Sequence, residues 1–254
     1  MKVSAFTCFV MTLLISPMTC LAQSEFVGKT KTATPPKNDY VVSVADLRMT
    51  KKVRAAFDKG TARLKKGDTA GSIVYFEHVI AEQPGFYRAH YNLGLAQLKL
   101  GRTVEAQESF QRAVDLTGGG YAPPQFGMGM ALCQLGEFAQ AEVALQRGLD
   151  LDPNSANGKY FMALAQLGLN RLLEAERSIQ QALLRSANFP QAYFLLARIH
   201  QRENNSPAVV EDLRAYLKLN PHSQGSEQAR AFLEQTQQMM KQRANPALVS
   251  TLAP

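Results

Sequence analysis

Residues 91–116 read YNLGLAQLKLGRTVEAQESFQRAVDL, and this stretch decides the fold. Its apolar and small residues recur at helical spacing in two runs, residues 93–98 and residues 106–116. Gly101 separates the two runs, and glycine tolerates the left-handed backbone that commonly ends a helix. The stretch therefore predicts two helices joined by a tight turn.

A small residue recurs through the chain at nearly constant spacing. Taking Gly94 as the landmark, steps of 34, 35, 34 and 34 residues connect five such positions. They are Gly60, Gly94, Gly129, Ala163 and Ala197. A small residue is expected there because the two helices of a hairpin approach closely, so we expect Gly94 to face Ala106 across its hairpin.

Three further columns keep the same period. Seven residues after each landmark stands a residue that tolerates the left-handed backbone: Gly67, Gly101, Gly136, Asn170 and Asn204. Twelve residues after it stands a mostly small residue: Ser72, Ala106, Ala141, Ala175 and Val209. Sixteen residues after it stands a large apolar one: Phe76, Phe110, Leu145, Ile179 and Leu213. Proline is expected to end the second helix at Pro84, Pro153 and Pro221.

The order leucine–glycine, alanine, aromatic, alanine at Leu93-Gly94, Ala106, Phe110 and Ala113 resembles the tetratricopeptide repeat. The resemblance implies an all-α fold, a right-handed superhelical solenoid of about five helix-turn-helix repeats. We expect the repeats at residues 53–86, 87–121, 122–155, 156–189 and 190–221. A lead-in helix is expected over 42–52, and a capping helix with Ser226 as its N-cap over 222–243.

The resemblance also implies a binding surface. In tetratricopeptide arrays the first helices line a concave groove, into which residues three before, one after and four after each landmark point. The residues three before are all aromatic here, and the groove becomes basic towards Arg198. The candidate groove residues are Phe57, Tyr91, Leu95, Phe126, Met130, Tyr160, Leu164, Phe194 and Arg198. The aromatic rings could instead pack between repeats, and both interpretations stay open.

The N-terminus has the layout of a secretory signal peptide. Lys2 precedes an apolar run over residues 6–15, followed by Pro17 and small residues up to Ala22. We predict a signal peptide over 1–22, a flexible linker over 23–41 and a disordered tail over 244–254. The chain is then periplasmic or secreted, with an uncleaved or lipid-attached anchor as the alternative. Cleavage would leave Cys133 as the only cysteine, so no internal disulfide could form.

The net charge of +7 is unevenly distributed. In residues 23–66, lysine and arginine outnumber aspartate and glutamate by 11 to 4. This basic segment could contact a membrane surface or an acidic partner, or could simply keep an end repeat in water. Nucleic acid is disfavoured as a partner because the basic residues are not interleaved with stacking aromatic side chains.

No arrangement typical of catalysis stands out. His78 and Glu82 lie one helical turn apart, but no further ligand follows at metal-site spacing, so we predict no metal site. The sequence likewise predicts no cofactor and no catalytic residue. The function expected is a non-catalytic scaffold of the cell envelope that binds a protein or peptide. The alternatives are a self-assembling or lipid-anchored component of an envelope secretion or assembly machine, and an enzyme with an unrecognised site. The oligomeric state stays open.

Overall fold

The computed structural model describes residues 49–245, and these form eleven α-helices and no strand. In chain order they are α3 (Lys51–Lys65), α4 (Thr69–Glu82), α5 (Tyr87–Lys99), α6 (Thr103–Leu116), α7 (Ala122–Leu135), α8 (Phe138–Leu151), α9 (Ala156–Gly168), α10 (Leu172–Arg185), α11 (Pro190–Arg202), α12 (Ser206–Leu219) and α13 (Gln224–Ala244). The predicted signal peptide, the predicted linker, residues 42–48 of the predicted lead-in helix and residues 246–254 of the predicted tail lie outside the described residues.

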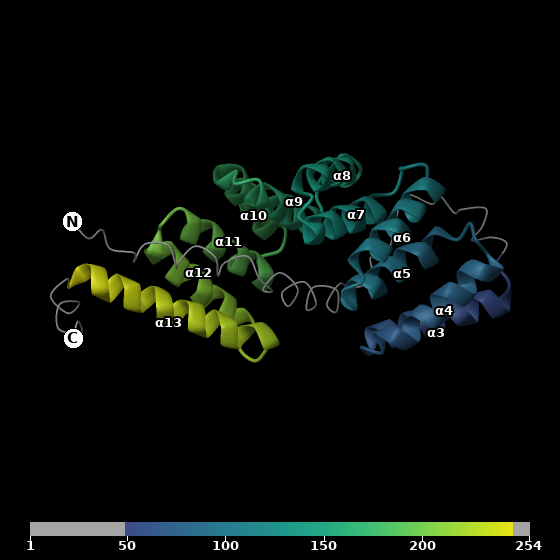
Figure 1. Ribbon diagram of the computed structural model, residues 1–254, viewed down its shortest axis with the longest axis horizontal. Coiled ribbons are helices and arrows are strands. Elements are labelled where there is room, and N and C mark those ends of the chain that lie inside the picture. The colour runs from purple at the N-terminus through teal and green to yellow at the C-terminus, as the bar shows by residue number, and fades with distance from the viewer. Residues whose placement is uncertain (1–48, 246–254) are drawn as a thin grey trace, which may run out of the picture.

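The helices form five antiparallel hairpins, α3–α4 to α11–α12, which stack into an arch (Figure 1). The last helix, α13, lies at the C-terminal end of the arch. The first helices of neighbouring repeats contact one another, from α3 with α5 to α9 with α11. The second helices pack mainly against the helix before and the helix after them in the chain. The first helices therefore line the inner side of the arch, and α8 and α10 lie on its outer side (Figure 1). This is the all-helical solenoid that the sequence predicts.

Inside each hairpin the landmark residue is buried, as are both columns on the second helix. A Cβ atom added to Gly94 would lie 2.8 Å from the Phe110 ring, and its three nearest atoms all belong to that ring. Phe110, one turn beyond Ala106 on α6, therefore fills the space directly against the glycine, while the expected contact of Gly94 with Ala106 stays a prediction. Gly60 meets Phe76, and Gly129 meets Leu145, in the same way.

The turn inside each hairpin uses the left-handed backbone at the predicted position. Gly67, Gly101, Gly136, Asn170 and Asn204 all have positive φ, between 58° and 88°. The next residue then donates a backbone hydrogen bond to a carbonyl of the last helical turn, as from Arg102 N–H to Gln97 O and from Arg171 N–H to Gln166 O, both 2.9 Å. This bond satisfies a carbonyl that the helix leaves unpaired and directs the chain back along the first helix.

The capping helix α13 packs against α12. Ser226 is not its N-cap as predicted; Ser223 holds that position, and Ser226 lies one turn inside the helix. The backbone N–H of Ser223 donates to Ser226 Oγ at 3.0 Å, completing a capping box. Ala229 and Thr236 on α13 are buried, so the helix covers the open end of the fifth repeat.

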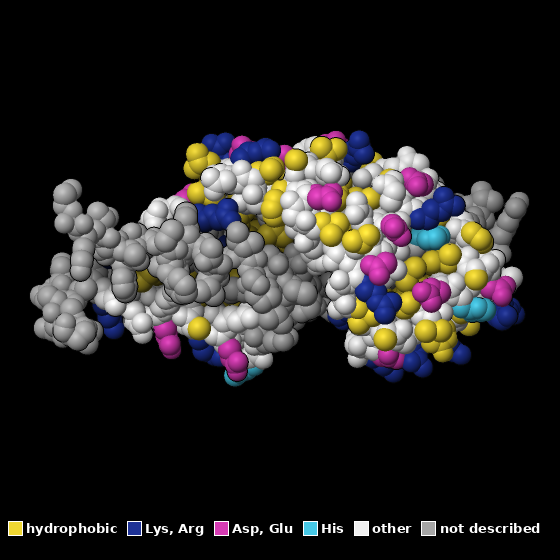
Figure 2. Space-filling view, in the orientation of Figure 1, with side chains coloured by type: hydrophobic (Ala, Val, Ile, Leu, Met, Phe, Trp, Pro, Cys, Tyr) yellow, Lys and Arg dark blue, Asp and Glu magenta, His cyan; other side chains and the backbone are white. Residues whose placement is uncertain are grey.

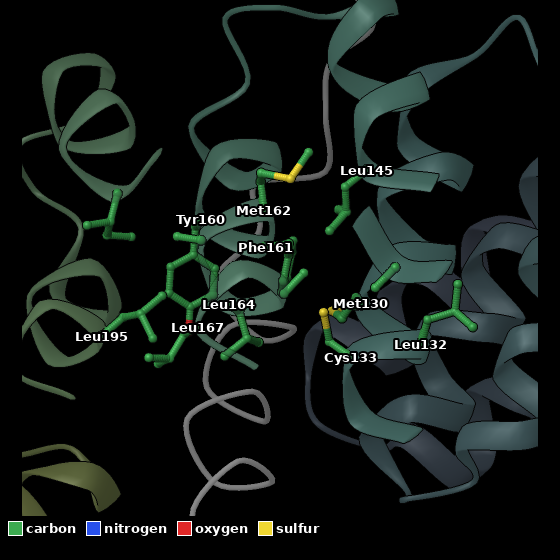
Figure 3. Packing of buried hydrophobic residues seen from close by; sticks show 14 of the residues in the cluster. Met130, Leu132, Cys133, Leu145, Tyr160, Phe161, Met162, Leu164, Leu167 and Leu195 are labelled. Carbon is green, nitrogen blue, oxygen red and sulfur yellow. The ribbon is translucent and has the colours of Figure 1, made fainter. Parts of the chain in front are cut away.

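The largest cluster of buried apolar side chains runs without a break through the middle repeats. In Figure 3, Met130, Leu132 and Cys133 come from α7, Phe161 and Leu164 from α9, and Leu195 from α11. Because three successive first helices share this core, neighbouring repeats stabilise one another. On the surface, acidic and basic side chains are interspersed over the face of the repeats that Figure 2 shows. No helix within residues 49–245 is both long and apolar enough to cross a membrane.

Candidate functional site

In three of the five repeats, the aromatic residue three before the landmark lies at the junction with the next repeat. The Phe57 ring is 5.0 Å from that of Phe86, the residue preceding α5, and the Tyr160 ring is 5.2 Å from that of Phe189, the residue preceding α11. A Cβ atom added to Gly158, at the start of α9, would lie 2.5 Å from the Phe126 ring. Phe126 therefore contacts the following repeat, and Phe57 and Tyr160 contact the residue directly before the first helix of the following repeat, as expected if the rings pack between repeats.

The other two aromatic candidates also have ring partners. Phe194 lies 5.4 Å from Tyr216 and 6.4 Å from Phe232 of the capping helix, measured between ring centroids. Tyr91 lies 5.8 Å from Phe110, and burial of its hydroxyl, with Tyr121 nearby, raises the Tyr91 pKa well above its usual range. Burial likewise raises the pKa of Tyr160 to about 12. The five aromatic residues thus have a packing function, whatever else they contact.

The residues one after each landmark lie on the same helices. Leu95 is half-buried and packs against the main core, whereas Met130 and Leu164 are buried. Cys133, one turn beyond Met130, is also buried, and burial raises the pKa of its thiol to about 12. A thiol in this state is protonated at neutral pH, so Cys133 acts as a small apolar side chain and not as a nucleophile.

Arg198 is the charged member of the inner row, the candidate residues one after each landmark: Leu95, Met130, Leu164 and Arg198. Burial lowers the Arg198 pKa, and the positive charge of Arg202 lowers it further, while Tyr160 acts in the opposite direction. Arg202 is itself held by a 2.7 Å hydrogen bond to the carbonyl oxygen of Leu167. No acidic side chain among residues 49–245 forms an ion pair with Arg198. A partly desolvated guanidinium with no carboxylate partner in the described part of the chain favours binding of an anionic group.

The outer side of the arch carries a polar pocket of about 720 Å³ between α8, α9 and α10. Its side chains bind one another: Ser178 Oγ donates to Gln166 Oε1 and Lys159 Nζ donates to Gln181 Oε1, both at 2.7 Å. At its edge, the Arg171 guanidinium donates two hydrogen bonds to the Glu142 carboxylate, at 2.9 and 2.8 Å. The Arg171–Glu142 contact joins the third and fourth repeats, whereas the other two lie within the fourth; the interpretation of the sequence did not identify any of them.

A second feature that the sequence interpretation missed is a side-chain pair that recurs inside the hairpins. It joins the residue three after the landmark to the residue fifteen after it. The pairs in contact are Arg63 over the ring of Tyr75, Gln97 with Ser109, Gln166 with Ser178, and His200 with Asp212. In the third hairpin the two positions hold Leu132 and Ala144. The fixed twelve-residue separation is a signal that could have revealed these pairs.

Comparison with known proteins agrees with this geometry. A family model described as tetratricopeptide repeat matches residues 57–121 and 160–224, together just over half of the chain. No curated protein sequence matches the chain.

Solved structures share the fold. The tetratricopeptide protein TTC0263 of Thermus thermophilus has 20% identity and a TM-score of 0.63 over 72% of this chain and 98% of its own. PilW, a type IV pilus biogenesis factor, has 15% identity and a TM-score of 0.64 over 81% of this chain and 100% of its own. YrrB has 15% identity and a TM-score of 0.51 over 69% of this chain and 90% of its own. The matched family model and the five stacked hairpins together show that the chain belongs to the tetratricopeptide repeat family.

Proposed function

We propose that the chain is a non-catalytic scaffold that binds a protein or peptide along the inner side of the arch. The observation that carries the proposal is Arg198, a partly desolvated cation on one of the first helices, which also carry the half-buried Leu95 and the buried Met130 and Leu164. Such a surface matches a peptide segment with apolar side chains and one acidic group placed against Arg198. YrrB, which shares the fold, is described as having an unusual peptide-binding site, so the architecture is compatible with this function.

The nine candidate residues then divide into two groups. The half-buried Leu95 and Arg198 would contact the partner directly, and the buried Met130 and Leu164 would pack beneath the contact surface. The aromatic residues Phe57, Tyr91, Phe126, Tyr160 and Phe194 would mainly set the angle between repeats and so shape the surface. A rigid frame of this kind lowers the conformational entropy lost when a partner binds.

The test compares Arg198→Gln with Arg214→Gln, which removes an exposed positive charge from α12. Both variants and the original chain are offered apolar peptides that carry either one glutamate or one glutamine at the same position. We expect the original chain and Arg214→Gln to prefer the glutamate peptides by about tenfold, which corresponds to about 1.4 kcal/mol. Arg198→Gln should lose this preference. If it retains the preference, the inner side near Arg198 is not the binding site.

A second experiment separates contact from framework at the rings. Tyr91→Ala, Phe126→Ala and Tyr160→Ala are each followed by circular dichroism for the fold and by titration with the preferred peptide. Variants that melt earlier but bind normally while folded indicate that the rings only join repeats. Variants that keep their melting temperature but bind about fivefold more weakly, a loss of about 1 kcal/mol, indicate that the rings are binding anchors.

Export to the cell envelope is part of the proposal and rests on the predicted signal peptide over residues 1–22. The basic residues between 23 and 66 would then meet a membrane surface or an acidic partner. N-terminal sequencing of the protein from fractionated cells tests this part. A soluble cytoplasmic protein that retains Met1 would contradict it.

An alternative is an accessory component of an envelope assembly machine that assembles with itself. PilW, which shares the fold over all of its own length, is a type IV pilus biogenesis factor. This alternative requires an oligomer whose mass in solution rises with protein concentration, whereas a monomer at every concentration would exclude self-assembly.

A further inference from the structure

A cluster of metal-ligating side chains lies where the fourth and fifth repeats meet. Glu176 on α10, His200 on α11 and Glu203 just after α11 have ligand atoms that all lie within 4.8 Å of one another. His200 Nε2 is 3.6 Å from Glu176 Oε1, and His200 Nδ1 is 2.6 Å from Asp212 Oδ2. Three carboxylates thus surround one imidazole. The His200 and Asp212 side chains retain only 14% and 13% of their exposure, so water screens this charge weakly.

The tetratricopeptide fold does not itself require this cluster. His200 and Asp212 occupy the positions of the recurring hairpin pair, which is Gln97 with Ser109 in the second repeat and Gln166 with Ser178 in the fourth. Those neutral pairs make the same contact at 2.7 Å. The ionisable residues of the fifth repeat are therefore not needed to hold the hairpin together.

Among the described residues, Glu176 has no arginine partner of the kind that the equivalent glutamate has one repeat earlier. Glu176 corresponds to Glu142 one repeat earlier, and Glu142 binds Arg171 through two hydrogen bonds. The residue corresponding to Arg171 is Asn205, whose side chain instead accepts the backbone N–H of Ala208 at 3.3 Å and caps α12. The junction thus keeps the carboxylate but replaces the arginine that neutralises it one repeat earlier. A negative site of this kind favours a bound cation.

The orientation of His200 suits a metal ligand. When Nδ1–H donates to Asp212, Nε2 keeps a free lone pair and lies 3.6 Å from Glu176 Oε1, and ligating histidines are usually oriented by such a carboxylate. His200 and Glu203 are three residues apart, so they share one face at the end of α11. One imidazole nitrogen and two carboxylate oxygens form a donor set that Zn²⁺ accepts, with water at the fourth position.

We propose that Glu176, His200 and Glu203 bind a divalent transition-metal ion, Zn²⁺ by its donor preferences, with Asp212 as the positioning residue for His200. Bonds of about 2.0–2.2 Å require the ligand atoms to approach one another by side-chain rotation. The ion would link α10 to α11, which pack less extensively than α4 with α5, α6 with α7 or α8 with α9. Metal binding would therefore brace the weakest of these four junctions between repeats, close to Arg198.

The test uses the tag-free chain treated with a chelator, titrated with ZnCl₂ in a calorimeter and melted with and without the metal. We expect one Zn²⁺ per chain and a rise in the melting temperature of about 2–4 °C or more at saturating metal. MgCl₂ should not reproduce the rise, because Mg²⁺ demands octahedral oxygen coordination.

Two variants test the ligands, and one variant is the control. Glu203→Gln keeps the size of the side chain but removes an anionic ligand, and should weaken Zn²⁺ binding by about tenfold or more. The double change His200→Gln with Asp212→Ser copies the neutral pair of the second and fourth repeats, so it should fold and lose the site. Glu211→Gln removes a neighbouring exposed charge and should bind as the original chain does.

Absence of one-to-one binding by the original chain would overturn the proposal and leave the cluster as an ion-pair network between helices. Equal Zn²⁺ affinity of Glu203→Gln and the original chain would overturn it as well.

Discussion

The interior of each hairpin and the junction between hairpins are built differently. Inside the hairpin the same contact recurs: a landmark residue meets a large apolar side chain sixteen residues later, as Gly94 meets Phe110 and Gly129 meets Leu145. At the junctions the contacts change from repeat to repeat. An arginine–carboxylate pair joins the third repeat to the fourth, and the cluster around His200 joins the fourth to the fifth.

This difference has a physical origin. The two helices of a hairpin are joined by a short turn, so their contact distance is set locally and only small residues fit at the landmark. Neighbouring hairpins have more freedom in their relative angle, and many side-chain combinations can fill the space between them. Repetition therefore maintains the fold, while variation at the junctions and on the inner side is available for function.

The largest expected effect comes from Phe110→Ala, because Phe110 belongs to both regions. Its ring fills the space at Gly94 within its hairpin and the space at Gly127 across the next junction. The side chain is fully buried, so its removal should destabilise the chain by about 3–5 kcal/mol. Urea unfolding followed by circular dichroism measures the loss. Val104→Ala on the exposed face of α6 is the matched control and should have little effect.

Gly94→Leu tests the hairpin interior alone. A side chain at this position would enter the space that the Phe110 ring occupies, so we expect destabilisation of about 1–3 kcal/mol or more. Gly85→Leu is the control, because a Cβ atom added to Gly85 meets nothing within 4 Å. Equal melting temperatures for the two variants would mean that close approach of the helices does not determine the landmark residue.

The positions that build the hairpin interior could be predicted from the sequence, but the residues that contact one another there could be predicted only in part. The left-handed residues, from Gly67 to Asn204, were identified from spacing, because only a few residue types adopt that backbone. The close contact of Gly94 with Phe110 was not predicted, since the sequence period does not show which of two neighbouring turns lies nearest to the glycine. Ser223 was missed as the N-cap of α13 because Ser226, one turn later, has the same capping chemistry.

The junctions could not be predicted to the same depth. The cluster of Glu176, His200 and Glu203 forms only if the fourth and fifth hairpins pack at a particular angle, and that angle cannot be predicted from the sequence. The candidate inner residues were located on the first helices by the family pattern, but the ring contacts at the junctions, such as Tyr160 with Phe189, required the structure. Whether the inner row binds a partner stays a prediction.

A smaller effect is expected at the turns. Asn170 has a φ of 61°, a conformation that costs a residue with a Cβ and no local polar compensation about 1 kcal/mol. Asn170→Ala should therefore lower stability by about 1 kcal/mol, whereas Asn170→Gly should leave it nearly unchanged. Chemical unfolding of both variants checks the difference. If alanine and glycine behave alike, the left-handed turn is not a constraint on the fourth hairpin.

The smallest effect is expected at the junction, from Arg171→Ala. The Arg171 side chain retains 41% of its exposure, so water and salt screen its two hydrogen bonds to Glu142. We expect a small drop in melting temperature at low salt, relative to Arg177→Ala, which removes an exposed charge from the same hairpin. The drop should vanish in 1 M NaCl, where the screening length falls to about 3 Å. If the drop persists in 1 M NaCl, Arg171 supports the junction through packing of its aliphatic stem. The difference between this junction and that of the fourth and fifth repeats would then not be one of charge.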